Sequence, residues 1–300
     1  MNRLVALPLL VLLAQCSSAP RRLMAAASSP ASAPAPAASS GGMIQIINVS
    51  AYDPKERQRN GRSYSENDVS ALRANGASAL IARAGKGGNL DTKCATFLSS
   101  ADRAGMLPGV YYRLQTHVDA VKQADQFISR VQSIARGRSW SAPALLLCAD
   151  FDANSRLSDM TRFLDRVESR TGVTPVVYLE NSEQLRLLLS GADSGTKAKL
   201  RRAPYWCALY NHTGGAGRVL PAPGSPEGLT RQYNVWSDWS LWQYGGVDWQ
   251  HGRSQPKVYS NGRYHFPTYF GNLDRPVERN VFKGSHASLV SFWQQHGLKL

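Results

Sequence analysis

Cysteines, acidic side chains and long apolar runs are all scarce in this 300-residue sequence. The 4 Cys show no C-x-x-C or Cys/His spacing of a metal site, and the three beyond residue 42 are too few for a full disulfide framework, although one pair stays open. No Gly-rich phosphate loop follows the first expected strand, which argues against an open nucleotide-binding sheet. The apolar run near the N-terminus spans about a dozen residues and is too short to cross a membrane.

Basic residues outnumber acidic ones, with 35 Lys and Arg against 21 Asp and Glu, a formal net charge of +14 and a pI near 9.9. This balance favours a polyanionic partner, such as nucleic acid, an anionic cell wall or a membrane surface, or it only aids solubility. No zinc-finger or RNP-type pattern is present, and the basic residues are scattered rather than gathered into one stripe. We therefore do not expect a nucleic-acid partner.

The N-terminal segment predicts export. Residues 1–16, MNRLVALPLLVLLAQC, have one Arg, an apolar run and then small residues, which is the layout of a secretory signal. Cys16 resembles the lipidated residue of a bacterial lipoprotein, although Gln15 departs from that pattern, so a lipid anchor and free secretion both stay open. Residues 17–42 are mainly Ala, Ser and Pro and predict an unfolded linker. Residues 43–300 are then the folded domain.

Strand-like and helix-like stretches alternate from Met43 onward. Five strand–helix units are followed by three strands with little helix, and a long Gly/Pro-rich loop joins the first two of these three. Repeated units of this kind imply parallel strands, and we expect an α/β, TIM-like barrel of irregular (β/α)5(β)3 form. The expected strands are 43–50, 77–84, 106–114, 144–150, 174–179, 203–210, 239–246 and 275–282, and the expected helices are 65–76, 91–105, 117–136, 157–170 and 181–190.

The stretch ALLLCADFDAN, residues 144–154, delivers two acids to the end of a strand. Residues i and i+2 of a strand point to the same face, so Asp150 and Asp152 project together while Phe151 packs the other way. Chemistry in parallel α/β folds sits at the C-terminal ends of the strands, which is where this pair lies. Such a pair suits glycoside cleavage, but Asp-x-Asp also binds divalent metals, and strand-end acids can be merely solvated.

The surrounding motifs resemble glycoside hydrolase family 25, the Chalaropsis-type lysozymes, whose barrel has five β/α units followed by three strands. The resemblance runs from about residue 44 to 293, and each motif is weak alone while their order is specific. The matching segments are IINVSAYDP (46–54), ALIARAGKGGNLDTKCATFLSSADRAGMLPGVYYRL (79–114), LLLCADFD (145–152), VVYLEN (176–181), APYWCALY (203–210), LWQYGG (241–246) and VERNVFKG (277–284).

The resemblance implies roles for four residues. Asp152 falls where the family keeps its Glu general acid/base, and Asp150 falls on the Asp that orients the substrate's 2-acetamido group. Asn48 takes the place of an Asp on the first strand, and Glu278 that of an Asp on the last. Family enzymes cleave the β-1,4 bond after N-acetylmuramic acid in peptidoglycan, with the acetamido oxygen as internal nucleophile, and need no metal or other cofactor.

Three of these four positions depart from the family pattern. Asp152 is one methylene shorter than Glu, which withdraws its carboxyl by roughly 1 Å, and such a misplacement can cost about a hundredfold in rate. Asn48 loses a charge, and Glu278 is one methylene longer than Asp. Four functions therefore stay open. The protein is a working muramidase, a hydrolase of altered linkage preference, a catalytically impaired peptidoglycan-binding protein or a metal-dependent Asp-x-Asp transferase.

Aromatic residues near expected strand ends suit the C–H faces of sugar rings. We expect Tyr112, Trp206 and Tyr210 to line a groove together with Gln243, while Arg83 either pairs with the site acids or forms a structural salt bridge. The expected partner is the peptidoglycan glycan strand, and a lipid-anchored chain would also contact the membrane. The sequence thus predicts an exported, monomeric protein of the periplasm and cell envelope or of the medium.

Overall fold

Eight strands close into a barrel in the computed structural model, which describes residues 43–50, 66–210, 219–248, 255–261, 264–265 and 277–300. The strands follow each other around the barrel as β1-β12-β8-β7-β6-β5-β4-β2, and β2 pairs with β1 to close it. Their bounds are β1 Met43–Val49, β2 Ala77–Lys86, β4 Leu107–Arg113, β5 Ala144–Phe151, β6 Val176–Leu179, β7 Tyr205–Ala208, β8 Leu241–Asp248 and β12 Glu278–Lys283. This confirms the expected TIM-like barrel.

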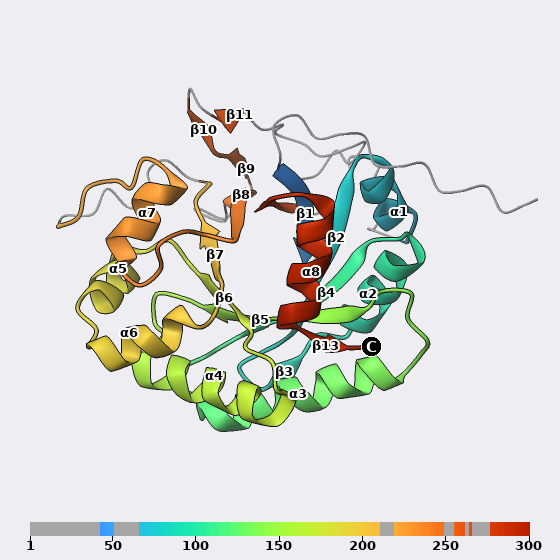
Figure 1. Cartoon of the computed structure of the whole chain (residues 1–300), viewed down its shortest axis with the longest axis horizontal. Coiled ribbons are helices and arrows are strands. Elements are labelled where there is room, and N and C mark those ends of the chain that lie inside the picture. Colours follow the sequence, from blue (N-terminus) through green and yellow to red (C-terminus); the bar gives the residue numbers. More distant parts are fainter. Residues whose placement is uncertain (1–42, 51–65, 211–218, 249–254, 262–263, 266–276) are drawn as a thin grey trace, which may run out of the picture. The chain divides into compact units, whose positions relative to one another are not determined.

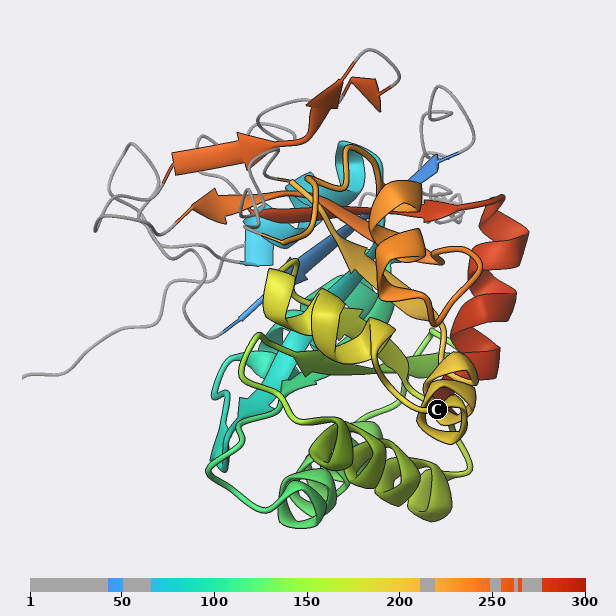
Figure 2. The same cartoon turned by 90° about the vertical axis from the view of Figure 1, so that its left-hand side faces the viewer.

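All neighbouring barrel strands are parallel except β12, which runs antiparallel to both β1 and β8. Five β/α units come first, as expected. Their helices, shown on the outside of the barrel in Figures 1 and 2, are α1 (Glu66–Ala74), α2 (Cys94–Arg103), α3 (Ala120–Arg136), α4 (Leu157–Thr171) and α5 (Glu183–Ser190). The N-cap side chains of Asp119 and Ser182 accept backbone N–H groups at the starts of α3 and α5, which satisfies donors that a helix start leaves unpaired.

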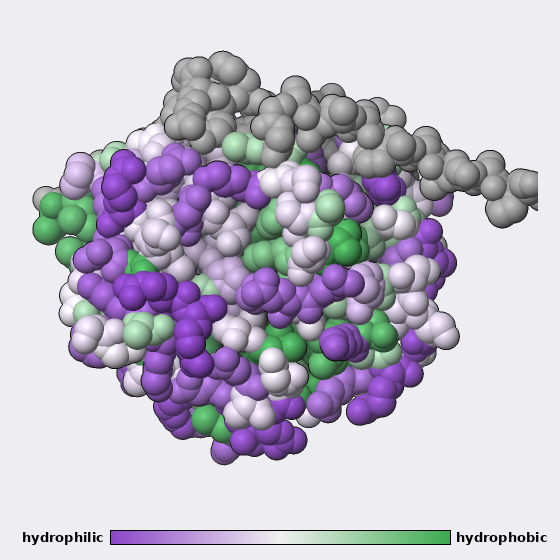
Figure 3. Space-filling view, viewed as in Figure 1, coloured by the Kyte–Doolittle hydropathy of each residue, from purple (hydrophilic) through white to green (hydrophobic). Residues whose placement is uncertain are grey.

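Apolar side chains form two clusters, one on each side of the strands. β5 is buried at all eight positions, as its continuous apolar run requires. The side chains of Leu146 and Cys148 join Ile46 and Trp206 in the inner cluster, while those of Leu147 and Phe151 pack outward beneath the helices. The exposed sides of α3 and α4 are largely hydrophilic (Figure 3). The barrel wall is thus the middle layer between two apolar layers.

Several elements lie beyond the sequence prediction. The expected loop between β7 and β8 contains α7 (Pro226–Tyr233), and α6 (Ser194–Arg201) precedes β7. After β12 the chain forms α8 (His286–His296) and β13 (Gly297–Lys299), which pairs antiparallel with the first half of β5. Trp293 of α8 is fully buried in the inner cluster and donates its indole N–H to the Pro108 carbonyl at 2.7 Å. This segment therefore packs at the N-terminal ends of the strands.

Short additional strands, β3 (Asn89–Leu90) beside β2 and β9 (Gln255–Val258) beside β8, extend the sheet, and β10 (Ser260–Asn261) pairs with β11 (Tyr264–His265). Cys94, Cys148 and Cys207 are all buried and free, so the disulfide pair left open by the sequence is not formed. No helix among the described residues has the length and apolarity that a membrane span needs. The predicted signal segment, Cys16 and the 17–42 linker lie outside the described residues.

Candidate active site

Four carboxyl groups meet at one end of the barrel. Asp150 is on β5, Asp152 and Glu180 follow the ends of β5 and β6, and Glu278 begins β12. The first three lie at C-terminal strand ends, whereas Glu278 reaches the same end because β12 runs in the opposite direction and pairs Glu278 with Asn48 of β1. We call this end the mouth. The mutual influence of these acids is visible at Asp150, whose pKa responds to the charges of the other three.

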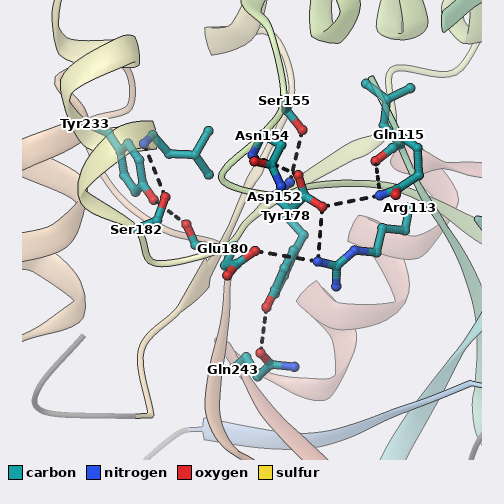
Figure 4. A network of polar contacts seen from close by, with 12 residues as sticks. Arg113, Gln115, Asp152, Asn154, Ser155, Tyr178, Glu180, Ser182, Tyr233 and Gln243 are labelled. Atoms are coloured by element: carbon teal, nitrogen blue, oxygen red, sulfur yellow. Dashed lines mark hydrogen bonds and ion pairs between the residues drawn. The ribbon is translucent and has the colours of Figure 1, made fainter. Parts of the chain in front are cut away.

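Asp152 is held by donors on both of its carboxyl oxygens (Figure 4). Its Oδ2 accepts from Arg113 Nη2 at 3.2 Å and from Gln115 Nε2 at 3.3 Å, and its Oδ1 accepts from the backbone N–H of Asn154 at 3.0 Å. The backbone N–H of Asp152 itself donates to Ser155 Oγ at 3.1 Å. Because three donors, one of them the Arg113 guanidinium, converge on a side chain that is only 9% exposed, the Asp152 carboxyl is held in a fixed position.

Asp150 has the opposite environment. Its residue is 5% exposed, and its Oδ1 is buried with no hydrogen-bond partner. The pKa of Asp150 is raised to about 7, chiefly by burial, with the charge of Arg113 lowering it and the charges of Asp152, Glu180 and Glu278 adding to the rise. Two acids on one strand face thus differ in environment, since Asp150 is partly protonated near neutral pH while Asp152 is held by three hydrogen-bond donors.

Arg113, the last residue of β4, lies between the acids. The same Nη2 that donates to Asp152 is 3.6 Å from Glu180 Oε2. The charge of Asp150 is the largest cause that raises the pKa of Arg113 above its usual range, so the guanidinium stays charged. One cation therefore faces several carboxyls at the mouth.

A chain of amide and hydroxyl contacts forms the polar floor beside these acids. Tyr178 Oη donates to Gln243 Oε1 at 2.8 Å, and Gln243 Nε2 donates to Asn48 Oδ1 at 3.2 Å. Asn48 also accepts from Asn280 Nδ2 at 2.8 Å and donates its own amide N–H to Glu278 Oε2. Asn48, Gln243 and Asn280 are each no more than 3% exposed, so these three side chains are almost completely closed to water.

Two of the predicted groove residues need correction. Tyr112 is fully buried on the outer side of β4, where its ring packs against Phe127 and Phe163, because strand alternation turns Arg113 toward the mouth instead. Trp206 is 2% exposed inside the barrel, and its Nε1 donates to Asn280 Oδ1 at 2.9 Å. It therefore supports the floor and offers no free face to a sugar.

The other predicted positions are nearer to their expected places. Tyr210 is half-buried at the end of β7, where its ring lies against Gly246, and Gln243 is part of the floor. Arg83 donates to Asp91 Oδ2 at 3.0 Å in a buried salt bridge, which is the structural alternative left open by the sequence.

Sequence reasoning missed Arg113 and Glu180 as site residues. Each is a charged residue directly at the end of an apolar strand, in the same position as the Asp150–Asp152 pair, and this signal could have found them. Among the described residues, no group of three or more His, Cys, Asp or Glu is arranged to hold a metal ion.

Comparison with protein families matches residues 62–252 to the model of glycosyl hydrolases family 25. This chain belongs to glycosyl hydrolase family 25. A search of curated protein sequences gave no match. Membership of this family makes the chain a glycosidase by class.

Solved structures support the family 25 fold over most of the chain. A bacterial lysozyme from Streptomyces coelicolor is 20% identical, with a TM-score of 0.55 over 86% of this chain and 100% of its own. A family 25 glycosyl hydrolase from Bacillus anthracis is 15% identical, with a TM-score of 0.52 over 88% and 100%. A muramidase from Acremonium alcalophilum is 17% identical, with a TM-score of 0.51 over 84% and 99%.

Proposed function

We propose that this family 25 protein hydrolyses the glycan strand of peptidoglycan, at the β-1,4 bond after N-acetylmuramic acid. Family membership supports a glycosidase, and the similar structures include a lysozyme and a muramidase. The basic balance of the chain suits residence on an anionic wall. The N-terminal signal would export the protein as a monomer, and a lipid on Cys16 with the 17–42 linker would let it reach the wall from a membrane.

The observation that carries the proposal is the buried Oδ1 of Asp150, which has no hydrogen-bond partner. An unpaired buried acceptor costs free energy that a bound donor recovers. The N–H of a 2-acetamido group is such a donor, and its capture would turn the acetamido oxygen toward the sugar C1. With a pKa of about 7, part of Asp150 is ionised at neutral pH, and this form can take the amide proton as positive charge develops on the acetamido group.

Asp152 would contribute an ionised carboxylate. Its contacts with Arg113, Gln115 and the Asn154 N–H keep it in place, and negative charge near C1 steadies an oxocarbenium-like transition state. Glu278, the half-buried end of the polar floor, would bind a sugar hydroxyl below this centre, and Asn48 and Gln243 would hold it in place.

A second function, peptidoglycan binding without cleavage, is favoured by one observation. The carboxyl that replaces the family's Glu is shorter and already occupied by three donors, so it is poorly placed to deliver a proton. In such a protein the mouth would hold a glycan and leave its bonds intact.

Digestion of purified sacculi separates the two functions. The hydrolase produces new reducing ends, identified by mass spectrometry as N-acetylmuramic acid, and Asp150→Asn lowers their rate of formation by about a hundredfold or more. Asp165→Asn removes an exposed acid of α4 that pairs with Lys199 and serves as the matched control with full activity. Pull-down by sacculi with no new reducing end would establish the binder instead, and loss of activity with a chelator would support a metal-dependent transferase.

A further inference from the structure

Glu180 lies beside Asp152 at the mouth, on the neighbouring strand. The parallel register of β5 and β6 pairs Asp150 with Tyr178 and Phe151 with Leu179, so the next residues, Asp152 and Glu180, follow at the same level. The Glu180 N–H donates to the Phe151 carbonyl at 3.0 Å and continues this pairing. Both side chains approach the one Nη2 of Arg113 (Figure 4).

The backbone of Glu180 is fixed while its carboxyl is accessible. Its carbonyl accepts from Tyr233 Oη at 3.0 Å and from the Ser182 N–H at 3.0 Å. The Glu180 side chain is 46% exposed, against 9% for Asp152, and its distance of 3.6 Å from Arg113 exceeds that of a good hydrogen bond. Glu180 can therefore exchange protons with solvent and change rotamer, whereas Asp152 is held by three donors.

We propose that Glu180 is the general acid/base that acts on the bridging oxygen of the glycan, in place of the acid that the chain lacks at position 152. This role rests on the proposed hydrolysis of peptidoglycan. Glu180 has the side-chain length that Asp152 has lost, and it supplies that length from the adjacent strand. The oxygens of the two acids lie 3.2 and 3.6 Å from one nitrogen, so these oxygens are at most about 7 Å apart, which does not exceed the upper limit of roughly 9.5 Å for glycosidase carboxyl pairs.

The charges at the mouth favour a proton on this cluster. The charges that act on Asp150 are those of Arg113, Asp152, Glu180 and Glu278, and the charges of Asp150, Asp152 and Glu180 in turn act on the Arg113 guanidinium. Like charges at such short range cannot all ionise without cost. Between the two acids that approach Arg113 Nη2, Glu180 is the accessible one, so it is the one placed to give a proton to a bound glycan.

The step balances with water as the only co-reactant. The Glu180 carboxylic acid gives its proton to the bridging oxygen while the C1–O bond breaks and leaves its electron pair on that oxygen. The acetamido oxygen of the same sugar forms a bond to C1. Water then adds to C1, the acetamido oxygen recovers its electron pair, and the Glu180 carboxylate takes the proton that the water loses.

Leaving-group dependence tests the assignment, because a nitrophenolate departs without protonation and a sugar hydroxyl does not. Glu180→Gln is expected to lower kcat on peptidoglycan by about a hundredfold or more, with KM within about threefold. On a nitrophenyl β-glycoside of an N-acetylglucosamine oligosaccharide, the kcat of the same variant is expected to fall by less than about tenfold. Asp152→Asn is expected to lose activity similarly on both substrates, because it removes a charge that both reactions need.

Glu168→Gln, the same substitution on α4 where Glu168 pairs with Arg202, is the control and retains wild-type rates. Equal thermal midpoints of Glu180→Gln and wild type show that the variant is folded. The assignment is overturned if Glu180→Gln keeps more than half of the wild-type kcat on peptidoglycan. It is also overturned if kcat falls by the same factor on both substrates. Wild-type protein that releases no reducing ends would refute the proposed hydrolysis and this role with it, whereas an active wild type with an active Glu180→Gln refutes this role alone.

Discussion

Asn48 donates its side-chain amide to the carboxylate of Glu278 across the antiparallel β1–β12 pair. The resemblance described from the sequence implies an Asp at each of these two positions. A facing Asn and Glu satisfy each other as donor and acceptor, whereas two facing carboxylates would repel. The Asn and the Glu at these positions are thus complementary to each other.

Asn48→Asp should destabilise the protein at pH 7. The new carboxylate cannot donate to Glu278, so a part-buried hydrogen bond is replaced by like-charge repulsion, and we expect a loss of about 1–3 kcal/mol in the free energy of unfolding. Urea unfolding at pH 7 and pH 5 measures this, and the loss should shrink at pH 5 because one carboxyl takes up a proton. The double variant Asn48→Asp/Glu278→Gln should recover stability, since the Gln amide can donate to the new acid. Wild-type stability of the single variant at pH 7 would contradict this account.

The raised pKa of Asp150 predicts a pH dependence of stability. Its pKa is about 7 in the folded protein, and an unperturbed Asp has a pKa of about 3.9. Between these values the native state binds more protons than the unfolded state, so the contribution of Asp150 to stability falls as pH rises from about 4 to 7 and then levels off. Asp150→Asn lacks this decline. Its thermal midpoint relative to wild type should therefore rise between pH 4.5 and pH 8, and a constant difference across that range would show that the native pKa is not raised.

Arg113→Met should inactivate the mouth without unfolding the barrel. It removes the guanidinium that holds Asp152 and faces Glu180, and we expect kcat on peptidoglycan to fall by about a hundredfold. The charge of Arg113 lowers the pKa of Asp150, so the decline of stability with pH should extend to higher pH in this variant. Arg162→Met, which breaks an exposed pair with Asp119, is the control and should retain activity.

Trp293→Ala should separate stability from catalysis. The side chain is fully buried in the inner cluster at the end of the barrel opposite the mouth, and its loss should cost about 3–5 kcal/mol. Measured below its lowered thermal midpoint, the variant should keep wild-type kcat. Trp293→Phe should cost less, because it retains most of the apolar volume. A selective loss of kcat in a folded Trp293→Ala protein would show that the two ends of the barrel are coupled.

Strand positions could be predicted from the sequence because apolar runs between helix signals are local features. All eight expected strands are present within a few residues, and the Asp150–Asp152 face followed from alternation alone. The helix α7 was missed although Ser225, Pro226 and Glu227 form a helix start, because the Gly- and Pro-rich stretch before it suggested an uninterrupted loop. The C-terminal α8 and β13 were missed because β13 is only three residues long and pairs with a strand far away in sequence.

The site was less predictable for two reasons. It depends on which alternate residues of each strand face inward, and on side chains that become neighbours only when the barrel closes. The run VYYR at the end of β4 has two adjacent Tyr, and composition alone does not say which side faces inward. Arg113 faces the mouth, so Tyr112 cannot. The pairing of Asn48 with Glu278 and the sharing of Arg113 between Asp152 and Glu180 arise only once the strands are side by side.

The antiparallel pairing of β13 with β5 also has a consequence during biosynthesis. The middle of β5 emerges from the ribosome well before residues 286–299 have been translated, so the nascent barrel has an open base with Leu146 and its inner neighbours uncovered. Completion of the hydrophobic interior must wait for the final helix and strand. A chaperone that binds apolar segments would find its target in this interval, and premature translation stops in this region should yield aggregation rather than a smaller working protein.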